Sequence, residues 1–191
     1  RQMDGDAALN TKLSSRFPFL DGGKRLILVT GHRRENFDGG MERICTALGT
    51  LAARGDTQIV YPVHPNPNVR GTVTAALGQV DNIHLIDPQD YLPFVYLLKK
   101  SHLVLTDSGG VQEEAPSLGK PVLVMRENTE RPEGVEAGTA LLVGTDVEKI
   151  LTNAARLLDD ASAYEQMSRQ HNPYGDGRAS ERIVEELLRH V

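Results

Sequence analysis

Six short apolar runs, separated by amphipathic stretches, constrain the fold of this chain more than any other feature. Each run is apolar throughout rather than alternating, which is the pattern a strand needs when both faces of its sheet are covered. The stretches between the runs repeat their apolar residues at about every 3.6 positions, the period of an α-helix. The runs are RLILVT at 25–30, TQIVYPV at 57–63, IHLI at 83–86, LVLT at 103–106, PVLVM at 121–125 and ALLVG at 140–144.

This alternation predicts an α/β fold with a doubly wound, Rossmann-like parallel sheet, in which helices connect the strands by right-handed crossovers. We expect the connecting helices at 41–54, 67–78, 91–100 and 110–118, and later helices at 146–158, 160–169 and 177–190.

The chain is expected to comprise three segments. In residues 1–24, about two helical turns are followed by proline and glycine, which predicts a connector or leading arm. Residues 25–170 form the predicted Rossmann-like domain. Residues 171–191 carry a C-terminal helix that completes this domain or crosses from it. A length of 191 residues suits one domain with a continuous core.

Charge and composition exclude several classes of protein. With 21 Lys and Arg against 26 Asp and Glu, the net charge of −5 lacks the basic excess of a nucleic-acid binder. No apolar run approaches the roughly 18 to 20 residues that a bilayer requires, so we expect a soluble, cytoplasmic protein without a membrane partner. The single cysteine, Cys45, excludes an intrachain disulfide and a multi-cysteine zinc site. Its helical pattern predicts an inert core thiol.

A serine and two glycines follow the fourth apolar run, at the expected start of a helix. Ser108, Gly109 and Gly110 present a hydroxyl and free backbone N–H groups, with no side chains to keep an anion away. The run matches neither common glycine-rich nucleotide signature. It nevertheless predicts a phosphate-binding turn. The alternative is that Ser108 caps the helix, whose first-turn acids favour the helix dipole.

Two further loops concentrate polar residues after the first and second runs. In residues 31–36, His32 is a candidate phosphate donor or general acid, and Arg33 and Arg34 could clamp a diphosphate or pair with Glu35. A solvated charged loop is the alternative. In residues 64–70, two prolines fix where His64 points, although a structural turn in which Asn66 caps the next helix explains the pattern equally well.

Residues suited to a nucleoside follow the third and fourth runs. The amide of Gln89 and the ring of Phe94 could bracket a planar base, although Phe94 also fits a core position. Glu113 and Glu114 lie about 100° apart on a helix, so only one can accept hydrogen bonds from ribose hydroxyls, and the pattern leaves open which.

A fifth polar loop follows the run at 121–125, where Arg131 could neutralise a phosphate. Because ligands of doubly wound sheets bind beyond the carboxyl ends of the strands, these five loops together predict a nucleotide diphosphate site.

The motifs in these loops resemble, in order and spacing, those of the non-hydrolysing UDP-N-acetylglucosamine 2-epimerases. The resemblance covers about residues 25–190. It implies a two-lobed architecture of the kind seen in nucleotide-sugar glycosyltransferases (GT-B type), with this chain as the C-terminal, UDP-binding lobe. The motifs are GHRREN, HPNPNVR, DPQDYLPF, DSGGVQEEAPSLGKPVLVMRENTERPE, VGTD and HNPYGDGRAS.

The resemblance assigns a role to each candidate residue and selects Glu114 over Glu113. It implies a catalytic His32 near the diphosphate, a uracil pocket lined by Gln89 and Phe94, phosphate contacts from Ser108, Gly109 and Gly110, ribose contacts from Glu114, diphosphate contacts from Arg131, and a regulatory UDP-GlcNAc site that includes Arg33 and His64.

The implied reaction interconverts UDP-GlcNAc and UDP-ManNAc by elimination and re-addition of UDP, and it supplies bacterial surface polysaccharides. The resemblance implies no metal or cofactor, and a homodimer at full length. Its proton-transfer carboxylates come from the N-terminal lobe. Because the chain begins at Arg1 and has the length of one lobe, we expect it to lack that partner lobe and to bind UDP without epimerising. The alternatives are a glycosyltransferase lobe and a non-catalytic nucleotide-sugar binding module.

Overall fold

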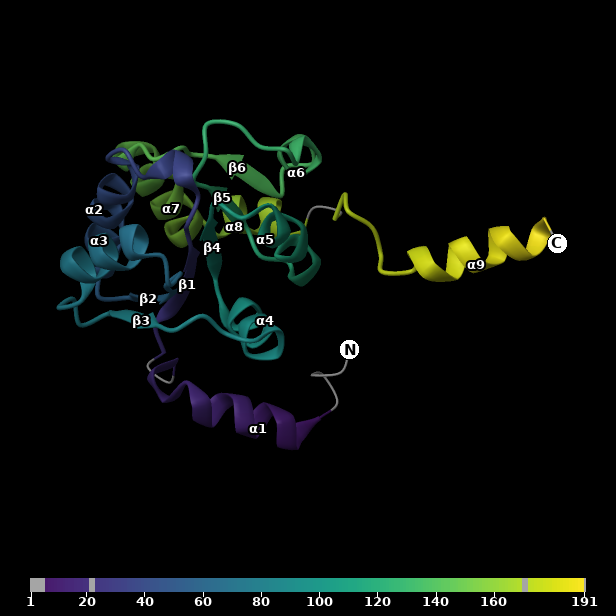
Figure 1. Cartoon of the computed structure of the whole chain (residues 1–191), viewed down its shortest axis with the longest axis horizontal. Helices are drawn as coiled ribbons and strands as arrows, with labels where there is room; N and C mark the ends of the chain where they lie inside the picture. Colours follow the sequence, from purple (N-terminus) through teal and green to yellow (C-terminus); the bar gives the residue numbers. More distant parts are fainter. Residues whose placement is uncertain (1–5, 21–22, 170–171, 191) are drawn as a thin grey trace.

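The computed structural model describes residues 6–20, 23–169 and 172–190. Within these residues, six parallel strands form one sheet in the order β3-β2-β1-β4-β5-β6 (Figure 1). The order reverses between β1 and β4, which makes the ends of these two strands the topological switch point. This confirms the predicted doubly wound sheet. The strands are β1 (Arg25–Thr30), β2 (Thr57–Pro62), β3 (Ile83–Ile86), β4 (Leu103–Thr106), β5 (Val122–Val124) and β6 (Ala140–Leu142).

Helices cover both faces of the sheet, because successive strand residues point to opposite sides. In β1, Ile27 packs in one core cluster and Leu28 in the other, and both are 0% exposed. The first cluster is covered by α2 (Gly40–Ala52), α3 (Pro67–Leu77), α7 (Val147–Asp159) and α8 (Ala161–Ser168), and the second by α1 (Ala7–Arg16), α4 (Tyr91–Lys100), α5 (Gly109–Glu114) and α6 (Pro132–Glu136).

Most elements begin and end where the sequence predicts. All six strands lie inside the predicted runs, and the helices agree within two residues except at 110–118. There α5 ends at Glu114 and a 3₁₀ turn follows over Pro116–Leu118, because proline cannot donate the hydrogen bond that would continue the helix. The short helix α6 and the 3₁₀ turns at Pro18–Leu20 and Arg34–Asn36 were not predicted.

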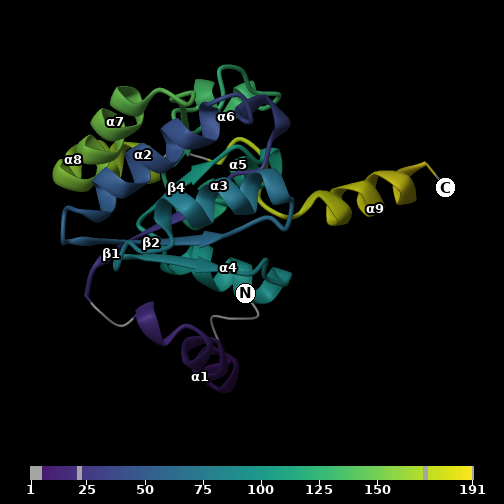
Figure 2. The same ribbon diagram turned by 60° about the vertical axis from the view of Figure 1, so that its left-hand side comes forward.

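The two terminal helices differ in how they meet the domain. Leu13 of α1 and Phe17, directly after this helix, are buried in the second core cluster. By contrast, α9 (Ala179–Arg189) has no buried residue and extends away from the domain in both views (Figures 1 and 2). Its apolar residues Ile183, Val184, Leu187 and Leu188 are between 54% and 71% exposed. The boundaries proposed at 24 and 170 remain predictions, and His171 of the last sequence motif lies outside the described residues.

Cys45 lies on α2 in the first core cluster, as the sequence predicts for a packing thiol. It is 2% exposed. Burial, with a contribution from Glu42, raises the pKa of the thiol to about 11, so the group stays protonated and unreactive near neutral pH. No helix of the described residues is long and apolar enough to span a bilayer.

The contrast between the core and α9 gives a stability prediction. Leu105 of the central strand β4 is 0% exposed, and Leu187 of α9 is 63% exposed. Leu105→Ala should lower the free energy of unfolding by about 2–5 kcal/mol because it leaves a cavity. The matched variant Leu187→Ala should change it by less than about 0.5 kcal/mol. Urea unfolding of this chain measures both values, and equal losses would show that α9 packs on the domain.

Candidate functional site

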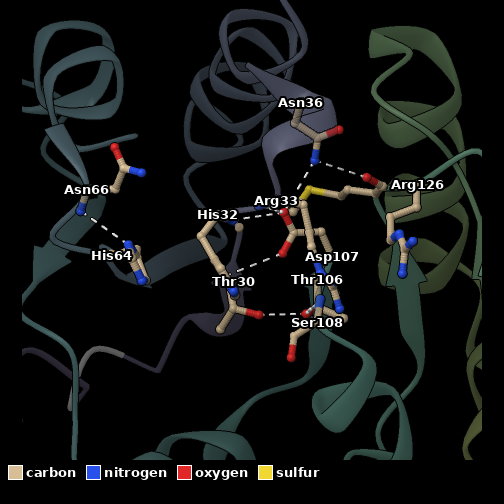
Figure 3. Close-up of polar contacts among 12 residues, drawn as sticks. Thr30, His32, Arg33, Asn36, His64, Asn66, Thr106, Asp107, Ser108 and Arg126 are labelled. Atoms are coloured by element: carbon tan, nitrogen blue, oxygen red, sulfur yellow. Dashed lines mark hydrogen bonds and ion pairs between the residues drawn. The ribbon is translucent and has the colours of Figure 1, made fainter. Parts of the chain in front are cut away.

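The loops that follow β1 and β4 meet at the switch point of the sheet. Thr30 and Thr106 end these neighbouring strands and pair in register. Their hydroxyl oxygens lie 2.6 Å apart, and the Asp107 N–H donates to the Thr30 carbonyl oxygen over 3.1 Å (Figure 3). The residues directly after both strands are therefore held at one edge, as the parallel fold predicts.

Asp107 organises this edge from beneath the loop of residues 31–36. Its side chain is 0% exposed, and its Oδ2 atom accepts the backbone N–H groups of His32 and Arg33, each over 2.8 Å. The Asn36 side-chain amide donates to the same oxygen over 3.3 Å and to the Met125 carbonyl oxygen over 3.4 Å (Figure 3). Sequence reasoning treated Asp107 only as part of a glycine-rich turn. The missed signal is a carboxylate placed directly after a fully apolar strand.

Tyr61 of β2 supports the start of the same loop. Its buried hydroxyl donates to the Gly31 carbonyl oxygen over 2.8 Å. Burial, with smaller electrostatic contributions from Asp107 and Cys45, raises the pKa of the Tyr61 hydroxyl, so it remains a donor. A Cβ atom at residue 31 would lie 3.0 Å from the hydroxyl oxygen, which explains the glycine there. This role of Tyr61 was not predicted from the sequence.

Arginines and glutamates of the loops after β1 and β5 form ion pairs with one another. Arg126 Nε lies 2.7 Å from Glu35 Oε1, and the Arg126 guanidinium also contacts Glu130. Arg33 Nη2 lies 3.3 Å from Glu130 Oε1. Hydrogen bonds from its own backbone N–H and from Arg126 hold the pKa of Glu130 below its usual range. Arg33 was expected to pair with Glu35 or a ligand, but its carboxylate partner is Glu130.

The rings of His32 and His64 stack on each other at the carboxyl edge of the sheet. Their ring centroids are 5.0 Å apart and the planes differ by 12°. His64 Nδ1 accepts the backbone N–H of Asn66 over 3.1 Å (Figure 3). The Asn66 side chain accepts the N–H of Asn68 over 3.0 Å. The capping turn that was the structural alternative for this loop is therefore present, and it places His64 against His32.

The turn after β4 leaves the Ser108 hydroxyl free of the capping role that was its alternative. Ser108 precedes α5 but makes no side-chain capping bond, and its own N–H donates to Thr106 Oγ1 over 2.9 Å. A Cβ atom at Gly109 would lie 2.7 Å from Glu130 Oε1, whereas one at Gly110 would meet nothing within 4 Å. Space for an approaching group is therefore open at Gly110.

The two adjacent glutamates of α5 have different surroundings. Glu113 contacts the Arg131 guanidinium. Glu114 makes no hydrogen bond or ion pair with the part of the chain that the structure describes, and burial with the neighbouring Glu113 raises the pKa of its carboxyl. Glu113 is thus engaged and Glu114 is the available acceptor.

Gln89 and Phe94 come from the segment between β3 and α4. The Gln89 amide donates to the Asp87 carbonyl oxygen over 2.6 Å. Phe94 is partly buried against the second core cluster, so the core position that was its alternative is observed in part.

Three buried side-chain atoms at this edge have no hydrogen-bond partner among the described residues: Arg33 Nε, Gln89 Oε1 and Asp107 Oδ1. Buried polar atoms are almost always paired, so each one needs an explanation, and a ligand or a moving partner supplies one. All three lie in loops that the sequence singled out. Within the described residues, no group of three His, Cys, Asp or Glu side chains could hold a metal ion.

Comparisons with known proteins agree on one family. The family model described as UDP-N-acetylglucosamine 2-epimerase matches residues 5–188. A UDP-N-acetylglucosamine 2-epimerase of Yersinia pestis is 61% identical over 183 residues, which are 95% of this chain and 49% of that protein. The chain thus spans about half the length of the curated relatives it matches.

Solved structures show the same relationship. The crystal structure of UDP-GlcNAc 2-epimerase from Neisseria meningitidis bound to UDP-GlcNAc matches with a TM-score of 0.91 and 48% identity, over 96% of this chain and 50% of that one. The glycosyltransferase WaaG matches with a TM-score of 0.65 over 97% of this chain and 51% of that one. At 15% identity, this second likeness shows the fold alone.

The Tyr61 contact gives a prediction about the site's support. Tyr61→Phe removes the donor and leaves the buried Gly31 carbonyl oxygen unpaired, so it should lower the free energy of unfolding by about 1–2 kcal/mol. Tyr91→Phe is the matched control, because Tyr91 is 66% exposed. Urea unfolding of both variants measures the difference, and equal stabilities would contradict the role given to Tyr61.

Proposed function

The chain belongs to the UDP-N-acetylglucosamine 2-epimerase family, and on that premise we propose that it is the UDP-binding half of an enzyme that interconverts UDP-GlcNAc and UDP-ManNAc. One observation supports this most: the loops after β1 and β4 meet at the switch point, and buried atoms of Arg33 and Asp107 there have no hydrogen-bond partner among the described residues. That edge is where doubly wound sheets bind nucleotides.

The diphosphate would lie at the turn after β4. The free N–H groups of Gly109 and Gly110 and the uncommitted hydroxyl of Ser108 supply donors that suit phosphate oxygens. Arg131 adds a guanidinium, which pairs with phosphate in a bidentate manner. His32, from the β1 loop, lies beside this turn, with Nδ1 3.7 Å from Asp107 Oδ1.

The nucleoside would extend from the diphosphate toward α4. Glu114, which has no hydrogen-bond or ion-pair partner among the described residues, would accept hydrogen bonds from the ribose hydroxyls. The unpaired Oε1 of Gln89 would accept a hydrogen bond from the uracil edge, with the Phe94 ring against the base.

The chemistry of UDP elimination fits this division of roles. Expulsion of UDP from C1 concentrates negative charge on the diphosphate, and preorganised donors such as His32 and Arg131 stabilise charge where it develops. Removal and return of the proton at C2 need positioned acids and bases. We assign those groups to a second lobe, which the relatives' doubled length accommodates.

The helix α9 and the histidine pair extend the proposal to the whole protein. The exposed apolar residues of α9 suit a contact with that second lobe, so we propose that residues 171–191 cross to it. Residues 1–24 would be the connector between lobes.

Because His64 stacks on His32, a regulatory UDP-GlcNAc site that uses Arg33 and His64 would adjoin the active site. We propose a cytoplasmic homodimer at full length.

Calorimetry with UDP tests the proposed site in this chain. Wild-type chain should bind UDP, and Arg131→Ala should weaken binding about tenfold or more, because a hydrogen bond to a charged group contributes about 1.5–3 kcal/mol. Arg169→Ala is the matched control, since Arg169 is 75% exposed and pairs with Glu165 of the surface helix α8. No binding at millimolar UDP, or equal binding by both variants, would count against the site.

The division between lobes makes a separate prediction about turnover. This chain alone should not convert UDP-GlcNAc to UDP-ManNAc in an NMR assay, because the proposed proton-transfer groups are elsewhere. Turnover near ordinary enzyme rates, about 1 s⁻¹ or faster, would place the acid and base within these residues instead.

A further inference from the structure

Asp107 carries a buried carboxylate whose two oxygens have unlike surroundings. The Oδ2 atom accepts hydrogen bonds from two backbone N–H groups and the Asn36 amide. The Oδ1 atom is buried and has no hydrogen-bond partner among the described residues. Leaving one oxygen of a buried carboxylate unpaired is costly, so a loop-holding role through Oδ2 does not by itself explain this side chain.

The basic atom facing Oδ1 is Nδ1 of His32, at 3.7 Å (Figure 3). This separation is within ion-pair range, and a small rotation of the ring would bring it to hydrogen-bond length. The other titratable ring against His32 is His64, whose Nδ1 already accepts the Asn66 N–H. The His32 side chain is 41% exposed, so part of the ring is open to solvent.

We propose that Asp107 is a positioning residue for His32: Oδ2 fixes the backbone of the 31–36 loop, and Oδ1 keeps the Nδ1–H of the ring turned inward. His32 then presents Nε2–H outward as a hydrogen-bond donor. The inference rests on the proposed function, because that function supplies the diphosphate which Nε2–H would meet.

This arrangement would place the Asp107 carboxylate at one nitrogen of the His32 ring and a phosphate at the other. A buried carboxylate at Nδ1 orients an imidazole and stabilises its doubly protonated form. A doubly protonated ring donates from Nε2 with a positive charge, and charge-assisted hydrogen bonds to phosphate are about twice as strong as neutral ones. An asparagine at residue 107 could still accept the backbone N–H groups through its oxygen. Its NH₂ group would then donate to Nδ1 and remove the proton from that side of the ring.

Asp107→Asn therefore separates the ring role from the loop role. In ¹⁵N spectra of the histidine rings of this chain at neutral pH, with His32→Gln used for assignment, Nδ1 of His32 should carry a proton in the wild type. In Asp107→Asn the same nitrogen should be bare, while the amide signals of the 31–36 loop stay dispersed. Asp90→Asn is the control, because this exposed residue makes no capping bond to α4. It should leave the His32 signals unchanged.

A wild-type His32 with a bare Nδ1, or identical ring spectra in the wild type and Asp107→Asn, would overturn the inference. If Asp107→Asn does not fold, the wild-type spectrum still decides, because it reports the proton on Nδ1 directly. These readouts need no UDP, so a chain that fails to bind UDP would refute the proposed function, while the ring spectra would still decide whether Asp107 positions His32.

UDP affinity supplies the functional readout. Asp107→Asn should weaken binding by roughly fivefold or more, as expected when a charge-assisted hydrogen bond becomes neutral. Because both residues would act through one contact, the Asp107→Asn and His32→Gln double variant should bind no more weakly than His32→Gln alone. Additive losses would mean that Asp107 acts on UDP by another route.

Discussion

The Asp107 carboxylate connects the two central strands at their carboxyl ends, and the site depends on this connection. It follows β4 directly and accepts two backbone N–H groups of the loop that follows β1. Asn36 extends the contact to the end of β5 through the Met125 carbonyl oxygen. Because the sheet fixes the spacing of these strands, the position of the 31–36 loop is set by its hydrogen bonds to the ends of the strands. Tyr61 of β2 also supports this loop, because its hydroxyl donates to the Gly31 carbonyl oxygen.

The positive charges of the site are concentrated at one edge of the sheet, where each of them pairs with a carboxylate. The whole chain has a net charge of −5, yet Arg33, Arg126 and Arg131 gather in two loops at one edge. Arg33 and Glu130 are 40% and 41% exposed, so their ion pair contributes no more than about 1 kcal/mol. A hydrogen bond from an arginine to a phosphate contributes about 1.5–3 kcal/mol. Such a weak pair leaves Arg33 available to an anionic ligand in spite of the acidic net charge of the chain.

The sequence predicted the fold more completely than the interactions within the site. Uniform apolar runs and helical periodicity depend on local spacing, so they located the strands and most helices. Residue spacing does not encode the backbone geometry that decides whether Ser108 caps its helix. It also does not show that Arg131 pairs with Glu113 rather than Glu114. The roles of Asp107 and Tyr61 were missed because their partners lie 75 and 30 residues away along the chain. A buried acceptor with distant donors leaves no periodic signal.

The most direct measurement of the central claim is a UDP titration of the ¹⁵N-labelled chain followed by amide NMR. The largest shifts should fall on Gly109, Gly110 and Arg131, with smaller ones at His32, because these groups lie at the carboxyl edge of the sheet. Signals of α9 should not move, since none of its residues is buried against the domain. The account is contradicted if UDP shifts no amide, or if the shifts gather at the opposite edge around Gly55, which precedes β2.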